Sequence, residues 1–126
     1  MKTFEQILEP HKKRLAEVKY PLSKEVDAYM SPDLYLFMKW AYRVGKGWYG
    51  FALSNDVPLV WAQIIDDFLD ELAKEAPNFE IHQIKLKFGG LRFYVDLRLS
   101  DKKKVDQINK EIEALTQTLF NEKLIY

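Results

Sequence analysis

The sequence contains no cysteine among its 126 residues. This absence excludes disulfide bonds, thiolate nucleophiles and the cysteine-rich zinc sites that hold many small domains together. It fits a reducing compartment, so we expect a cytoplasmic protein. The chain also lacks the roughly 18 consecutive apolar residues of a membrane-spanning helix. Its first ten residues are charged and have no apolar stretch, so we expect neither a signal peptide nor a membrane association.

The sequence has no excess of charge of either sign, because 19 basic residues balance 19 acidic ones. A protein dedicated to duplex nucleic acid is usually basic, so any nucleic-acid role here needs a local patch of positive charge. Apolar residues make up 48% of the chain, which is typical of a globular protein. No repeat or linker interrupts it. We expect one domain, residues 1–126.

Catalytic signatures are absent as well. The glycine-rich stretch 45–50 precedes no Lys-Ser or Lys-Thr pair and opens no helix, so it is not a phosphate-binding loop. No serine occupies the setting of a nucleophile elbow. We therefore expect a protein that is not an enzyme and that needs no cofactor or metal.

What is present is a strong hairpin signal in residues 81–98. Two runs of alternating polarity meet at Gly89-Gly90, a dipeptide suited to a tight turn. With a two-residue loop at that point, Phe88 would face Leu91. The apolar face would then carry Ile84, Leu86, Phe88, Leu91, Phe93 and Val95, continued by His82 and Leu97. Ile81 would fall on the opposite face.

That opposite face combines cations with an aromatic ring. We call it the basic–aromatic face and define it by Lys85, Lys87, Arg92 and Tyr94. Such a surface can hold single-stranded RNA or a nucleotide by phosphate pairing and base stacking. It can equally meet an acidic protein surface, or be an ordinary solvent-facing side of a strand. The sequence leaves these three interpretations open.

Amphipathic helices are predicted on both sides of a short strand. Apolar residues at helical spacing indicate helices over residues 58–75 and 101–120, with Ser100 as the cap of the second. The stretch 48–53 reads as a bulged strand, because an isolated hairpin is marginal and favours a third strand. We expect an α+β fold, in which the two helices cover one face of a three-stranded antiparallel sheet.

Smaller elements are predicted around this centre. Thr3 and Gln6 form a capping-box pattern, a short turn is expected over residues 24–29, and the apolar tail 123–126 could add a strand. A further helix over residues 32–44 carries two apolar stripes, so we expect it to be buried on two sides.

The sequence also holds several aromatic residues that need not all be buried. They are Tyr29, Tyr35, Trp40, Tyr42, Trp48 and Tyr49, together with Met30. Exposed Trp, Tyr and Met are frequent anchors of interfaces, so Trp48 and Tyr49 are added to the candidate contact surface.

Titratable side chains offer only weak alternatives. Asp66, Asp67, Asp70 and Glu71 could hold Mg²⁺, but the favoured interpretation is the solvated face of an amphipathic helix. His82 is interpreted as a hydrogen-bonded core residue, and His11, next to three basic residues, as solvated.

The string Ile84-Lys-Leu-Lys-Phe-Gly-Gly-Leu-Arg-Phe-Tyr94 resembles a motif of small uncharacterised proteins of bacteriophages and bacterial mobile elements. In those proteins a helix precedes Lys-Glu-Lys-Phe-Gly-Gly-Leu-Arg-Phe-Tyr, so the resemblance spans roughly residues 57 to 98. Leu86 stands where that pattern has Glu. The resemblance implies a phage-type provenance and no known activity. Proteins of that provenance often bind and inhibit host machinery.

We therefore expect a non-catalytic binding protein that inhibits a host defence effector such as a CRISPR nuclease. Its partner would be a host protein or a ribonucleoprotein complex, with RNA contacts made through the basic–aromatic face. One alternative is a nucleotide-binding domain in which Trp48, Tyr49 and this face close over the ligand. A second is a small enzyme that uses His82 with Asp96 or with the acids of the helix 58–75.

Overall fold

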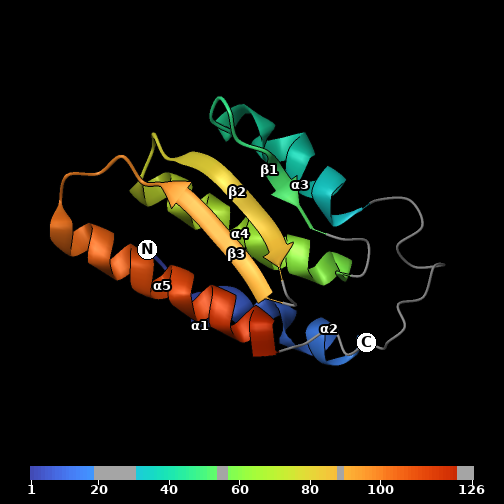
Figure 1. The fold of residues 1–126 in the computed structure, drawn as a ribbon. Helices are drawn as coiled ribbons and strands as arrows, with labels where there is room; N and C mark the ends of the chain where they lie inside the picture. The colour runs from blue at the N-terminus through green and yellow to red at the C-terminus, as the bar shows by residue number, and fades with distance from the viewer. Residues whose placement is uncertain (19–30, 54–56, 88–89, 122–126) are drawn as a thin grey trace.

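A three-stranded sheet in the order β1-β2-β3 forms one layer of the molecule, and helices form the other (Figure 1). The computed structural model describes residues 1–18, 31–53, 57–87 and 90–121. The described elements are α1 (Phe4–Leu8), η1 (Glu9–His11), α2 (Lys12–Ala16), α3 (Pro32–Trp40), η2 (Ala41–Arg43), β1 (Gly50–Ala52), α4 (Leu59–Glu75), β2 (Glu80–Lys87), β3 (Gly90–Asp96) and α5 (Lys102–Asn121). The predicted α+β class is confirmed.

The third strand is present but runs in a direction that was not predicted. β1 is parallel to β2, with Gly50 beside Gln83 and Ala52 beside Lys85, so the sheet is mixed and not wholly antiparallel. Parallel neighbours need a long crossover connection, and α4 supplies it between β1 and β2. The helix that covers the sheet therefore also sets the direction of β1.

The hairpin pairs in a register two residues away from the predicted one. Leu86 lies opposite Leu91 and Lys87 opposite Gly90, so Gly90 belongs to β3 and not to the turn. Residues 88–89 lie outside the described part of the chain, and with them the predicted place of Phe88. Because side chains alternate with a period of two, a shift of two leaves every residue on its predicted face. The predicted division of β2 and β3 into an apolar face and a basic–aromatic face therefore holds although the predicted register is wrong.

A bulge at His82 changes the faces at the start of β2. The ladder passes from Gln83 opposite Tyr94 directly to Ile81 opposite Val95, which leaves His82 as the extra residue. Ile81 is consequently fully buried on the core face. The prediction that Ile81 faces outward and His82 faces the core is wrong, because it assumed unbroken alternation.

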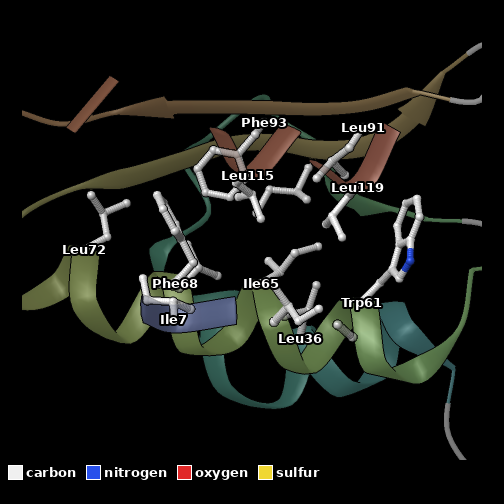
Figure 2. Close-up of a cluster of buried hydrophobic side chains, with 14 of the residues drawn as sticks. Ile7, Leu36, Trp61, Ile65, Phe68, Leu72, Leu91, Phe93, Leu115 and Leu119 are labelled. Carbon is white, nitrogen blue, oxygen red and sulfur yellow. The ribbon is translucent and has the colours of Figure 1, made fainter. Parts of the chain in front are cut away.

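The core lies between the sheet and the two long helices, as predicted. Figure 2 shows Trp61, Ile65, Phe68 and Leu72 of α4 pointing towards the sheet, which contributes Leu91 and Phe93, while α5 contributes Leu115 and Leu119. Within this core the ring of Phe68 contacts the rings of Phe4 and Phe93, with centroids 6.4 and 5.6 Å apart. In Figure 1 α4 lies behind the sheet and α5 runs along the side of β3. On the face of β3 that does not contribute to the core, Arg92, Tyr94 and Asp96 are exposed.

Helix α3 packs beside α4 and buries only one of its sides. Leu36 and Trp40 enter the core, whereas Leu34, Phe37 and Met38 are exposed. The prediction of burial on two sides is wrong. A helix at the edge of a two-layer fold meets a neighbour over one arc only, and here that arc carries Leu36 and Trp40, which belong to neither of the two predicted stripes.

The helix ends follow capping chemistry. The capping box of Thr3 and Gln6 is confirmed. The cap of α5 is Asp101 and not Ser100, because the Asp101 carboxylate accepts hydrogen bonds from the backbone N–H groups of Lys103 and Lys104. The predicted turn at 24–29 and strand at 123–126 lie outside the described residues. Among the described helices, none combines the length and the apolar character needed to cross a membrane.

Candidate functional site

The basic–aromatic face is the solvent side of the hairpin. Lys85 of β2 lies directly opposite Arg92 of β3, and Gln83 lies opposite Tyr94 in the next pair on the same face. Arg92 and Lys87 are exposed, and Tyr94 keeps 47% of its surface open to solvent. In Figure 1 this side of β2 and β3 faces the viewer, with α4 behind the sheet. The structure therefore brings the four predicted residues together on one accessible face.

The pairing of Lys85 with Arg92 is electrostatically unfavourable. Residues directly opposite on antiparallel strands have Cβ atoms about 5 Å apart, and like charges in such pairs destabilise the sheet. Among the ion pairs of the described residues, none involves Lys85 or Arg92. Since the chain contains as many acids as bases, this concentration of positive charge is a local feature of the face.

A loop before β1 extends the same surface. Val44 bridges to Ile81 and Gly50 pairs with Gln83, so the five residues 45–49 stand opposite His82 alone. The backbone N–H of Trp48 donates to the Gly45 carbonyl at 3.3 Å, which closes the loop on itself. The loop of residues 45–49 before β1 thus lies beside the bulge at His82 in β2.

Two glycines shape this loop. A Cβ at Gly45 would lie 1.9 Å from Oε1 of Glu80, so any larger residue would displace that carboxylate. Gly50 has φ +76°, a left-handed conformation that costs other residues roughly 1–2 kcal/mol, and a Cβ there would lie 3.0 Å from the Val44 side chain. The glycines of this stretch therefore allow a specific close turn.

The loop places Trp48 on His82. The two rings are stacked, with centroids 4.3 Å apart and an interplanar angle of 4°. Nε2 of His82 lies 3.8 Å from Oε1 of Glu80, and Glu80 pairs with Asp96, on the same side of β3 as Arg92 and Tyr94. His82 is thus a half-buried residue at the Glu80 end of the basic–aromatic face and not a core histidine.

Of the two aromatic residues added to the predicted contact surface, Trp48 therefore joins the four residues of the face. Tyr49 is exposed, and within the described parts of the chain no ring contact or side-chain hydrogen bond ties it to them. Trp48 itself retains 48% of its surface in solvent, because His82 covers one side of its indole. The sequence contains one indication of the bulge. Strict alternation along β2 would bury His82 and expose Ile81, and a bulge at His82 removes that conflict.

The two acids at this end of the face are already neutralised. Nη2 of Arg98 lies 2.8 Å from Oε2 of Glu80, and Nε of Arg98 lies 3.9 Å from Oδ2 of Asp96. Arg98 adopts φ +52°, and its backbone N–H donates to Asp96 at 3.0 Å. The positive charges of Lys85 and Arg92 are therefore not offset by these neighbouring carboxylates.

The acidic residues of α4 form a separate cluster with a structural role. Oxygens of Asp66, Asp67 and Asp70 come within 4.8 Å of one another. Trp40 Nε1 donates to Asp66 at 2.8 Å, and Lys39 lies 3.1 Å from Asp66 and 2.8 Å from Asp70. The interpretation of a merely solvated face is wrong for Asp66, because this carboxylate fastens α3 to α4.

His11 completes the cluster from the N-terminal side. Its Nε2 lies 2.6 Å from Oδ2 of Asp67, and its side chain is largely shielded from water, so the prediction of a solvated His11 is also wrong. Burial, followed by the charges of Asp66 and Asp67, raises the pKa of Tyr35. Partial burial lowers the pKa of Lys39, but hydrogen bonds to Asp70 and Asp66 outweigh it and raise the pKa overall. Cationic and hydrogen-bonding partners thus occupy positions that a metal ion would need.

Replacing Asp66 with alanine is expected to lower the free energy of unfolding by about 1–3 kcal/mol, because it leaves the buried indole N–H of Trp40 without its acceptor. Urea unfolding followed by circular dichroism measures this loss. Asp66→Asn, which keeps an acceptor oxygen, is the matched control and should lose less. If Mg²⁺ instead raised the melting temperature of the wild type but not that of Asp66→Ala, the cluster would be a metal site.

Comparison with protein-family models, with curated proteins and with solved structures found no match for this chain. The resemblance of the hairpin motif to phage proteins therefore stays a prediction.

Proposed function

We propose that this chain is a non-catalytic binding protein that docks an anionic partner on its basic–aromatic face. The observation that carries the proposal is the cross-strand pair of Lys85 and Arg92, two like charges held side by side. Neither forms one of the ion pairs found among the described residues. A binding site can retain such a pair at the expense of stability, because the partner relieves the repulsion. Tyr94, on the same face, supplies the kind of exposed aromatic contact that anchors interfaces.

The partner we propose is a host defence effector, such as a CRISPR nuclease or its ribonucleoprotein complex, which the chain would inhibit. Support for this finer step comes from the resemblance of residues 84–94 to a motif of phage and mobile-element proteins. The cations of the basic–aromatic face would mainly accelerate and orient association, while its aromatic side chains would contribute to the lifetime of the complex.

Affinity purification from a bacterial lysate tests the proposal. The bait is the wild-type chain, and its retained proteins and nucleic acids are identified with and without nuclease treatment. The triple variant Lys85→Glu, Lys87→Glu, Arg92→Glu is expected to lose the retained partner. The matched control Lys102→Glu, Lys103→Glu, Lys110→Glu makes the same charge change on exposed positions of α5 and should retain it.

A thermal melt of both triple variants verifies that each is folded. If the face variant retains every partner of the wild type, the basic–aromatic face is not the docking surface. If the wild type retains nothing beyond what the control resin retains, the proposal of a host partner fails.

A further inference from the structure

The aromatic rings of the face differ from those of an ordinary protein-binding patch in their arrangement. Trp48 is held flat against His82, so one side of its indole is covered and the ring is oriented before any ligand arrives. Trp48 keeps 48% of its surface in solvent, so the residue stays accessible to a ligand. A ring fixed in this way gives up little conformational entropy on binding, which favours stacking.

Positive charge lies beside these rings on the same sheet face. Tyr94 lies two residues along β3 from Arg92, so its pair with Gln83 is the next one on the same face after that of Lys85 and Arg92. Gln83, the partner of Tyr94, separates it from Gly50 of β1, which follows Trp48 by two residues. Adjacent strands lie about 4.8 Å apart, so two aromatic residues and the two cations are within reach of one short extended ligand.

Such a set fits an unpaired nucleic-acid strand better than an acidic peptide. A single strand offers phosphates for Lys85 and Arg92 and unstacked bases for Tyr94 and Trp48, whereas acidic side chains would use the cations alone. A duplex hides its base faces and could use only the cations, and the chain as a whole has no net positive charge to attract it.

We propose that the basic–aromatic face, together with the Trp48–His82 stack, binds single-stranded nucleic acid. Lys85 and Arg92 contact successive phosphates, and Tyr94 and Trp48 stack with bases. This inference rests on the proposed function and names the chemistry of the partner surface: an exposed strand of RNA or DNA, such as a ribonucleoprotein presents.

Fluorescence anisotropy with a labelled short uridine homopolymer tests the proposal directly, with a duplex of equal length and an oligoglutamate as competitors. We expect the single strand to bind more tightly than either competitor. The slope of log K against log salt should be about −1.4, as for the two neutralised phosphates that Lys85 and Arg92 contact on a single strand. Tyr94→Ala and Trp48→Ala should each weaken binding by about fivefold or more, because stacking on each base is lost.

Lys85→Glu is the decisive variant, because loss of binding cannot be mistaken for loss of fold. It places a carboxylate opposite Arg92 and converts a repulsive pair into an attractive one, so its melting temperature should equal or exceed that of the wild type. Its affinity for the uridine strand should fall about tenfold or more, with a shallower salt slope. Lys102→Glu on α5 is the matched control and should change neither quantity.

Three results would overturn the inference: no binding of the single strand by the wild type at low salt, equal binding of the duplex with no effect of Tyr94→Ala, or tighter binding of the oligoglutamate. The last result would identify an acidic protein surface as the occupant. When one of these three results is obtained, the lysate experiment decides how far the failure reaches. If the wild type still retains a protein through the basic–aromatic face after nuclease treatment, only this inference is wrong. If the wild type retains nothing, the proposed function is wrong as well.

Discussion

Replacing Phe68 with alanine is expected to lower the free energy of unfolding by about 3–5 kcal/mol, the usual cost of removing a buried phenyl ring. Phe68 is fully buried in the middle of α4, and its ring meets Phe4 of α1 and Phe93 of β3. It therefore joins the N-terminal helix, the long helix and the hairpin at one point. Urea unfolding, with the change in midpoint multiplied by a shared slope, measures the loss.

The matched control is Phe37→Ala, the same substitution in another helix. Phe37 is 59% exposed on α3, so its removal should change the stability by no more than about 0.5 kcal/mol. Since a domain of this size has roughly 5–15 kcal/mol in total, Phe68→Ala could leave a minor unfolded population, and Phe68→Leu then provides a milder measurement. Equal losses at the two positions would mean that α3, and not the α4–sheet interface, carries the core.

The contrast between these two phenylalanines indicates where sequence reasoning succeeds. The apolar stripe of residues 58–75 has only one continuous side, so the helix and its buried face could be predicted to within a residue at its start. The stretch 32–44 is apolar on several sides, and periodicity predicted two stripes that contain neither Leu36 nor Trp40. The buried side is set by α4, which contacts α3, and it carries these two residues.

The hairpin illustrates a second limit. Lys85, Arg92 and Tyr94 stay on the face opposite the apolar residues in any two registers that differ by two residues. The candidate site could therefore be predicted without the correct turn. The turn itself is set by local backbone geometry, and Gly89-Gly90 allowed more than one loop. Pairing of Gly90 with Lys87 thus moved the register by two residues and left the face intact.

The direction of β1 and the place of Trp48 depend on contacts between distant segments. Asp33 of α3 accepts a hydrogen bond of 2.8 Å from the backbone N–H of Leu53, just after β1, and burial raises the pKa of Asp33 although this bond lowers it. Together with the crossover through α4, this contact ties β1 beside β2. Short-range patterns carry no trace of either constraint, so the sequence did not predict the stacking of Trp48 on His82.

Deleting Lys85 is expected to destabilise the protein far more than deleting His82, although the two residues lie three positions apart in one strand. Removal of His82 takes out the extra residue of the bulge and leaves Gln83 opposite Tyr94 and Ile81 opposite Val95. The main loss is the stack with Trp48, so the cost should be about 1 kcal/mol. The predicted separation of the two faces would persist.

Removal of Lys85 cannot be absorbed in this way, because it reverses the faces on which the preceding residues of β2 lie. Even if the bulge closes to compensate, the fully buried Ile84 must move to the solvent face and Gln83 into the core. Loss of one buried isoleucine costs about 2–5 kcal/mol, and burial of an unpaired amide adds to it. Lys85→Ala, which keeps the length of β2, should remain close to the wild type. Equal urea midpoints for the two deletions would show that β2 slips freely past β3, and that the bulge does not determine which side chains form the basic–aromatic face.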